Sequence, residues 1–275
     1  MFVFVGQPAN YYLDYPIRQL VKYSYLPVVL AGREPVCRVK HGSASYMVRF
    51  VEALAAKGVR FLPATHANVV QRDPAGVTMA FSEAGRRWEE RFEQVILSAQ
   101  PHGALSVLGE HATKVEREIL EAIPFTNDTV IIHRDERFMP ARREQWRHAN
   151  MIVADEDEKV DRDRPFLVTK WTKSNVDRET DVFATYAYNR RLDIRGGVPV
   201  TFSHVKVTPE VVRLRRRLRA VQGQGRVWFA GSWLRNFTLH EDGLVSGFEA
   251  ANGIMAGLQE YPVIKPHNIS ATKKK

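Results

Sequence analysis

The most informative part of the sequence, residues 226–257, reads RVWFAGSWLRNFTLHEDGLVSGFEAANGIMAG. It predicts a hydrophobic strand over residues 227–230, a loop over 231–243 and a helix over 244–258. Glycines and other small residues stand at the strand end and along the helix, where a ligand or another backbone has to come close. Because a helix N-terminus carries free N–H groups and partial positive charge, the stretch predicts a site for a phosphate or an anionic cofactor.

In residues 43–225, the spacing of apolar residues and the turn residues predict further helices and strands. A helix over residues 43–57 begins at a serine cap and ends at Gly58, and a hairpin is predicted over residues 68–81. We also expect strands over 59–62, 92–97, 129–133, 166–171 and 182–188, and helices from 101, 114 and 209. A polar stretch over 82–90 leads into the strand over 92–97, and residues 155–163 are expected to form a solvated loop.

Composition limits the classes of protein. The 275 residues are 44% hydrophobic and 26% charged, which excludes a wholly disordered chain, and the net charge is +9. That charge favours anionic partners such as phosphate, nucleic acid or a membrane surface without selecting one. A single cysteine, Cys37, excludes an intramolecular disulfide scaffold. Apolar runs stay below the ~18 residues of a membrane span, and residues 1–5 are too few for a signal peptide, so we expect a soluble cytoplasmic protein.

Three short motifs within residues 226–257 resemble those of a known family. They are Phe229-Ala230-Gly231-Ser232, then His240-Glu241-Asp242-Gly243, then Ser246-Gly247. Together they resemble the C-terminal FAD-binding motif of the flavin-containing amine oxidase and phytoene desaturase superfamily. They look most like its subgroup of predicted NAD/FAD-binding proteins that occur with cyclopropane fatty acid synthases. In that subgroup the strand, "HEDG" and a helix beginning "SG" follow in the same order.

The resemblance extends over most of residues 33–258. Residues 39–46 resemble the subgroup's "V-x-G-G-S-x-x-Y", with His41 in place of the first glycine, and residues 95–100 resemble its "VI-x-A" strand end. A third match, to "LH-x-D … MP … R … W" and "TYW-x-N", consists of His133, Asp135, Met139, Pro140, Arg143, Trp146, Thr185, Tyr186 and Asn189.

The N-terminal G-x-G-x-x-G that cradles the FAD pyrophosphate in this superfamily has no counterpart here. Gly223-Gln224-Gly225 precedes a strand, which is the wrong order, and residues 253–257 lie inside a predicted helix. The chain therefore resembles the C-terminal part of a larger flavoprotein fold, as a truncated, split or degenerate form. Residues 236–239 also differ from the aromatic and glycine residues that the subgroup has before "HEDG".

FAD is the cofactor that the resemblance implies. Its predicted binding residues are Gly231, Ser232, His240, Glu241, Asp242, Gly243, Leu244 and Ser246. Gly243 is expected to need an unusual backbone conformation close to the isoalloxazine ring. The alternative interpretation of residues 240–243 is a polar turn in which Asp242 caps the helix. No catalytic residue is assigned, and no histidine has metal-ligand spacing, so no metal site is predicted.

Other residues favour structural interpretations. The basic run, Arg213, Arg215, Arg216, Arg217 and Arg219, is predicted to be a solvated helix face and not a nucleic-acid site, because aromatic residues do not interleave with it. His102 follows a predicted strand end. Lys170 lies on a predicted strand, and amine oxidases use a strand lysine near the flavin, but the motifs do not align it with that lysine.

These observations predict a mixed α/β fold: an incomplete FAD/NAD(P)-binding Rossmann-type domain with an inserted, mostly antiparallel substrate-domain sheet. The expected parts are a partial FAD-binding region (1–127), the sheet (128–201), the C-terminal strand-loop-helix (202–262) and a basic tail (263–275). The implied function is oxidation of a small-molecule substrate by hydride transfer to FAD. Two alternatives stay open, a non-catalytic remnant or subunit that needs a missing N-terminal half, and a basic protein that binds nucleic acid or anionic lipid at the membrane surface.

Overall fold

A computed structural model describes residues 16, 39–153, 166–172, 180–187, 192–235 and 238–257. The predictions for Cys37, the loop over 155–163 and the tail over 263–275 lie outside these residues. The chain divides into two compact units, one made of Met1–Phe61 and Phe125–Lys206, the other of Leu62–Pro124 and Val207–Lys275. Helices and sheets are mixed in the described chain, as predicted.

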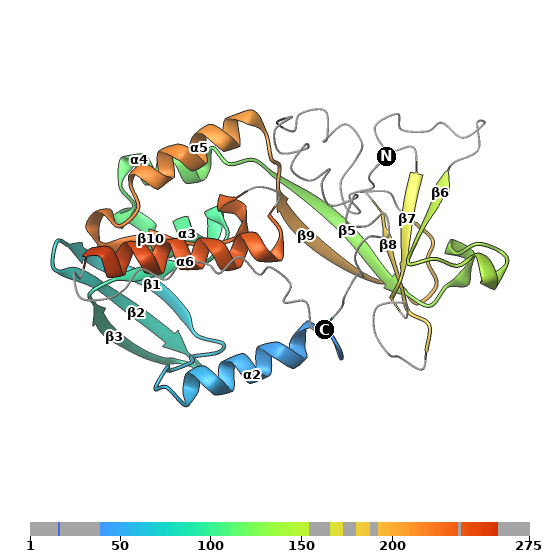
Figure 1. Ribbon diagram of the computed structural model, residues 1–275, viewed down its shortest axis with the longest axis horizontal. Helices are drawn as coiled ribbons and strands as arrows, with labels where there is room; N and C mark the ends of the chain where they lie inside the picture. The colour runs from blue at the N-terminus through green and yellow to red at the C-terminus, as the bar shows by residue number, and fades with distance from the viewer. Residues whose placement is uncertain are drawn as a thin grey trace, which may run out of the picture. The chain divides into compact units, whose positions relative to one another are not determined.

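The second unit contains a three-stranded antiparallel sheet, β1-β2-β3, visible on the left of Figure 1. β1 (His66–Asp73) and β2 (Gly76–Glu83) form the predicted hairpin, whose turn is held by the Asp73 carboxylate as it accepts the N–H groups of Ala75 and Gly76. The polar stretch over 82–90 includes the first part of a strand that was not predicted, β3 (Arg86–Phe92), which pairs with β2 along its whole length. The apolar residues of β1 and β2 form the buried face: Val69, Val77 and Met79.

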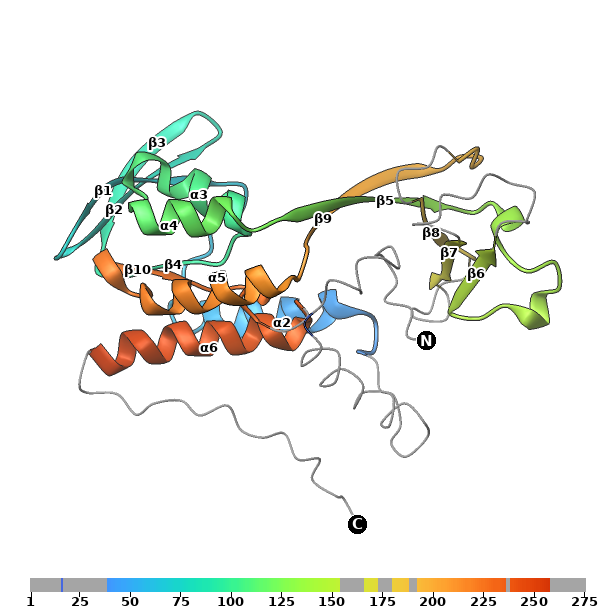
Figure 2. The same ribbon diagram turned by 90° about the horizontal axis from the view of Figure 1, so that it is seen from above.

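Among the described residues of this unit there are also a parallel strand pair and four α-helices. β4 (Val95–Leu97) pairs in parallel with β10 (Val227–Phe229), and Figure 2 shows the pair between α3 (Pro101–Leu108) and α6 (His240–Gly257). α4 (Lys114–Glu121) begins with a reciprocal capping box between Thr113 and Glu116. α5 (Pro209–Ala220) begins, as predicted, with Thr208 as its cap and proline at its first position.

The first unit contains a five-stranded antiparallel sheet in the order β6-β7-β8-β5-β9. The strands are β5 (Phe125–His133), β6 (Ala149–Val153), β7 (Phe166–Trp171), β8 (Phe183–Tyr186) and β9 (Val198–Val205). β7 has the predicted bounds, whereas β6 and β9 were not predicted. α2 (Ser43–Ala55) confirms the predicted helix, but its N-cap residue is Gly42, without a side-chain cap, so the predicted serine cap is wrong. Residues 59–62 form no strand.

Candidate functional site at the carboxyl edge of the parallel strands

β4 and β10 run in the same direction, so their carboxyl ends meet at one edge. Val227, Trp228 and Phe229 lie opposite Val95, Ile96 and Leu97, and the Ala230 N–H donates to the Leu97 carbonyl at 3.0 Å. Beyond this edge, α3 begins at Pro101 and α6 at His240. In open α/β sheets, ligands bind outside the carboxyl ends of the strands, and this edge is therefore the candidate site.

Three of the predicted site residues form one hydrogen-bonded junction. The Gly231 N–H donates to the Ser246 hydroxyl at 2.8 Å, and that hydroxyl donates to the Gly243 carbonyl at 2.7 Å. Ser246 is 1% exposed, so its bonds are shielded from water. A Cβ atom placed on Gly243 would lie 3.8 Å from the backbone nitrogen and Cβ of Ser232. The strand end, the loop and the first turns of α6 are thus held together.

Gly231 is required by its backbone. Its φ of +135° is one that residues with side chains rarely adopt, and an added Cβ would lie 2.8 Å from the Trp233 ring. Gly243 differs. It lies in the first turn of α6, is not among the residues with positive φ, and has room for an ordinary Cβ contact. The expectation that Gly243 needs an unusual backbone conformation is therefore wrong.

α6 begins at His240, four residues before the predicted start. The Asp242 carboxylate, which is buried, accepts the Leu239 N–H at 3.0 Å, and the Gly243 N–H donates to the Leu239 carbonyl at 3.2 Å. Both bonds extend the helix upstream, in the way that an acidic residue in the first turn reaches back in a capping box. Leu244 and Ser246 consequently lie beyond the first turn. Residues 240–243 are part of the helix and not a turn before it, and Asp242 stabilises the helix start from within the first turn.

Three of the remaining predicted residues lie outside the buried junction. His240, Glu241 and Leu244 are exposed on the first turns of α6, and Leu244 has 54% of its surface open to solvent. Arg235, which precedes α6, contacts two carboxylates of that helix. It forms an ion pair with Glu249, and its Nε lies 3.9 Å from the Asp242 carboxylate. The predicted site therefore consists of an inner group that fixes the junction and an outer group that can face a ligand.

Sequence reasoning missed Arg215, which supports the same edge from α5. It was predicted to be solvated, but it is 4% exposed, and its Nε donates to the Trp233 carbonyl at 2.6 Å. The Trp233 indole N–H donates in turn to the Ala99 carbonyl at 3.1 Å, beyond the end of β4. The signal was present in the spacing, since Arg215 falls within the buried stripe of α5 formed by Val211, Leu214 and Leu218.

Two of the described motif residues of the first unit, Met139 and Trp146, belong to one buried cluster. Met139, Trp146 and Phe183 form a buried cluster against Trp171, and the Trp146 indole N–H donates to the Pro140 carbonyl at 2.8 Å. The Arg143 guanidinium lies 4.5 Å from the Trp146 ring centroid and bonds Asp181. These contacts give this part of the motif a structural role.

His133 and Lys170 also have partners in the five-stranded sheet. The Asp135 N–H donates to His133 Nδ1 at 3.0 Å, and His133 Nε2 lies 2.8 Å from the Thr185 hydroxyl. Burial lowers the pKa of His133 below its ordinary value, while the bond to Arg137 holds the pKa of Asp135 far below its own. The Lys170 ammonium donates to the Tyr186 hydroxyl at 3.1 Å.

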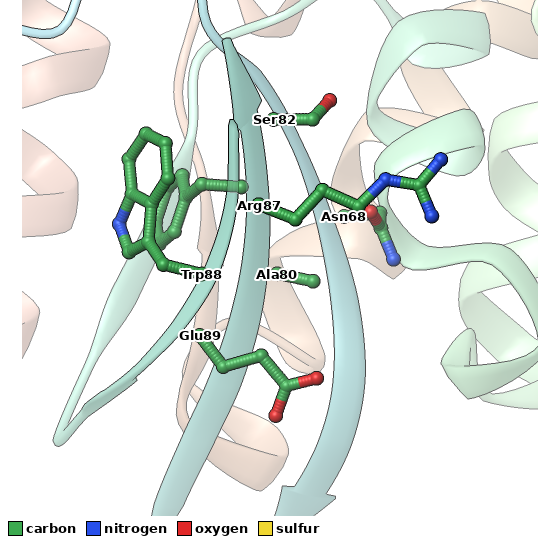
Figure 3. A pocket seen from close by; sticks show the side chains of 7 residues that line it. Asn68, Ala80, Ser82, Arg87, Trp88 and Glu89 are labelled. Atoms are coloured by element: carbon green, nitrogen blue, oxygen red, sulfur yellow. The ribbon is translucent and has the colours of Figure 1, made fainter. Parts of the chain in front are cut away.

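Two cavities lie on the three-stranded sheet. The larger, about 590 Å³, is lined by residues of all three strands: Asn68, Ala80, Phe81, Ser82, Arg87, Trp88 and Glu89. Figure 3 shows the Arg87 and Trp88 side chains on opposite sides of β3. The other, about 460 Å³, shares Asn68 and extends to His111. Neither contains a residue of the carboxyl edge. Among the described residues no group of histidines, cysteines and carboxylates could hold a metal ion, and none of the described helices could span a bilayer.

Comparison with solved structures identifies proteins with a similar fold. No family model and no curated protein matches this chain. Among solved structures, cyclohexylamine oxidase from Brevibacterium oxydans is similar over 79% of this chain and 53% of its own, with a TM-score of 0.53 and 14% identity. Reduced UDP-galactopyranose mutase is similar over 74% and 49%, with a TM-score of 0.43 and 12% identity. The chain spans about half the length of these structures, and it shares the fold of that part of an amine oxidase.

Proposed function

We propose that this chain is the C-terminal part of an FAD-dependent oxidoreductase of the amine oxidase type, with the flavin at the carboxyl edge of β4 and β10. The observation that carries the proposal is the junction in which Ser246 joins Gly231 to Gly243. It holds the first turn of α6 against the end of β10, so that the positive end of the helix faces the edge where ligands bind. The shared amine oxidase fold supports the same function.

The residues present fit this cofactor. Ser232 offers a hydroxyl beside the strand end, and the outer group His240, Glu241 and Leu244 stands exposed on the first turns of the helix. Gly231, Gly243 and Ser246 would hold these residues in place. The partial positive charge of a helix N-terminus stabilises negative charge on a reduced isoalloxazine ring. FAD, when bound, supplies the hydride acceptor, and this chain supplies its position and its electrostatic environment.

Two further questions concern the substrate and the location of the pyrophosphate-binding unit. The association with cyclopropane fatty acid synthases has no support among the comparisons, and the substrate class stays open among amines, fatty acyl chains and polyenes. We further propose that the pyrophosphate-binding unit with G-x-G-x-x-G belongs to another segment or subunit, since this sequence lacks the motif. The alternative, a non-catalytic remnant, would also need the G-x-G-x-x-G unit from another segment or subunit. It differs from the oxidoreductase only in that it would not use FAD.

The contacts of α5 weaken the third interpretation, a protein that binds nucleic acid or anionic lipid through the basic run. Arg215 is buried, Arg213 pairs with Glu210, and Arg217 pairs with Glu118. Carboxylates and burial therefore take up much of the charge that phosphates would have to meet.

Flavin titration tests the proposal. The 275-residue chain alone should bind FAD weakly, because the pyrophosphate cradle is missing, whereas the chain combined with a G-x-G-x-x-G unit should purify with flavin absorbance. Tight, stoichiometric binding of FAD by the chain alone would show that the pyrophosphate site lies within it. A complete protein that takes up no flavin would overturn the function and favour the remnant.

A further inference from the structure

The three-stranded sheet ends at β3 within the part of the chain that the structure describes (Figure 1). β2 pairs with one side of β3 from Arg86 to Phe92, and no described strand pairs with the other side. Such an outer side offers its N–H and C=O groups to a strand of another chain. β3 is therefore a surface to which a further strand can add.

The turn before β3 determines which peptide groups face this open side. Its two residues, Ala84 and Gly85, both have positive φ, at 46° and 86°, which is the conformation of a type I′ hairpin. In a β-turn the residue after the two central ones directs its N–H back across the turn, so Arg86 bonds β2. Successive peptide groups of a strand alternate in direction. Those of Arg87 and Glu89 therefore face away from β2.

The order of charges along β3 is inverted about Trp88. Arg86 and Arg87 precede the tryptophan, and Glu89 and Glu90 follow it. When a second copy of the strand runs antiparallel with its Trp88 opposite the first, each arginine of one strand stands opposite a glutamate of the other. Arg87 then faces Glu89, and Arg86 faces Glu90. Both relations occur twice, because the arrangement has twofold symmetry.

The same register satisfies the backbone. Residues opposite one another in an antiparallel pair direct their peptide groups either both toward the neighbouring strand or both away from it. Arg87 and Glu89 both face outward, so they form a hydrogen-bonded pair in this register, and Trp88 lies at the closer, non-hydrogen-bonded position. The neighbouring registers that the backbone allows are centred on Arg87 or on Glu89, and each places two like charges opposite one another. Backbone and charge therefore favour one alignment.

The side chains of β3 fit this pairing. Arg87 and Glu89 are exposed, and Arg87 lies on the opposite face of β3 from Trp88 (Figure 3). Trp88 stacks on Phe81 of β2, with 5.4 Å between the ring centroids, which holds the indole at the surface of the sheet. Because side chains alternate along a strand, the two charged residues share one face, and the two tryptophans meet on the other.

We propose that β3 pairs with β3 of a second copy of this chain, antiparallel and centred on Trp88, so that the two three-stranded sheets become one. Charged residues usually protect the edge of a sheet, because a second copy brings like charges to it. Here the inverted order brings unlike charges instead. One strand buries less surface than a standard interface of about 1,600 Å², so the dimer is weak and dissociates on dilution. The pairing does not depend on the proposed function.

Amide exchange tests the backbone part of the pairing. As the concentration of the chain rises, the N–H groups of Arg87 and Glu89 should exchange more slowly, because they become hydrogen-bonded to the second copy. The N–H of Trp88 faces β2 and should exchange at the same rate throughout. Exchange at Arg87 and Glu89 that is independent of concentration would overturn the pairing through this edge.

Sedimentation velocity of the full 275-residue chain at increasing concentration tests the role of the charges. The unmodified chain should form a dimer that dissociates on dilution. Arg87→Glu places two glutamates opposite one another at both symmetric positions, and Glu89→Arg places two arginines there. Because like charges in an interface repel, each variant alone should raise the dissociation constant roughly tenfold or more. Arg216→Glu, an equal change of charge on the exposed face of α5, should leave the dissociation constant unchanged.

An equimolar mixture of Arg87→Glu and Glu89→Arg tests the register. In a mixed dimer every negative position of one variant faces a positive position of the other, so the mixture should dimerise as tightly as the unmodified chain. This recovery would also show that both variants fold. The proposal is overturned by an unmodified chain that stays monomeric at all concentrations, by single variants that dimerise as tightly as the unmodified chain, or by a mixture no tighter than its components.

Discussion

The Gly231 N–H donates a 2.8 Å hydrogen bond to the hydroxyl of Ser246, fifteen residues later in the chain. The same hydroxyl donates to the Gly243 carbonyl, so one buried side chain joins the end of β10 to the first turn of α6. In Ser246→Ala the Gly231 N–H loses its acceptor, a hydroxyl on a side chain that is 1% exposed, and we expect a loss of about 1–3 kcal/mol in the free energy of unfolding. Denaturant melts measure it.

Ser106→Ala is the matched control, because Ser106 lies exposed on α3. It should change the free energy of unfolding by less than about 0.5 kcal/mol. Equal effects of the two substitutions would show that the hydroxyl of Ser246 contributes nothing to the junction.

The buried ion pair between Arg72 and Glu116 gives a second prediction. The Arg72 guanidinium donates to both Glu116 oxygens, at 2.7 and 2.8 Å, and these side chains are 7% and 0% exposed. Glu116→Gln leaves the buried guanidinium without a counter-charge, so we expect a loss of about 3–5 kcal/mol. The exposed pair Arg117–Glu121 is the comparison, and Glu121→Gln should cost less than about 1 kcal/mol. A small effect of Glu116→Gln in chemical denaturation would contradict the burial of this pair.

Acid should destabilise the first unit through His133. Its Nδ1 accepts the Asp135 N–H, and burial lowers its pKa in the folded chain below the ordinary value of 6.5. Between the folded and unfolded pKa values the unfolded chain binds more protons, and stability therefore falls as the pH falls below about 6.5. Asp135, whose pKa is lowered by Arg137, stays ionised in both states through this window and does not contribute.

Melts at pH 7.5 and pH 5.5 measure the effect of His133. His133→Gln should show a smaller change between the two pH values than the wild-type chain, whereas His66→Gln, which alters an exposed histidine, should keep the wild-type change. An unaltered pH dependence in His133→Gln would assign the acid sensitivity to other groups.

Helices and hairpins with local signals in the sequence, such as caps, apolar stripes and turn residues, were predicted correctly. α5 follows from a threonine cap, a proline and an apolar stripe, and the first hairpin follows from the Asp73 turn. β3 was missed because its sequence, RRWEERF, is polar, and it becomes a strand through pairing with β2 and stacking of Trp88 on Phe81. Conversely, residues 59–62, which are apolar apart from Arg60, form no strand, because a strand needs a partner that the local sequence does not reveal.

The same distinction applies to the candidate site. The resemblance to a known FAD-binding motif led to the prediction that Gly231, Gly243 and Ser246 belong to one site, and hydrogen bonds through Ser246 join these three residues. The start of α6 was misplaced because it depends on how Asp242 bonds the Leu239 N–H, and Asp242 can also cap a helix that begins after it. Burial of Arg215 required the position of Trp233, which comes from another element.

The central claim, a flavin at the carboxyl edge of β4 and β10, is tested most directly by two valine substitutions in α6. An added Cβ at Gly243 makes only an ordinary contact with Ser232, and one at Gly247 meets open space, so both variants should fold. We predict that Gly243→Val loses flavin from the complete protein, because its branched side chain enters the space beside Ser232. Gly247→Val and Arg216→Ala should keep the wild-type flavin content. Full flavin in Gly243→Val, or its loss in Arg216→Ala alone, would contradict the claim and place the cofactor elsewhere.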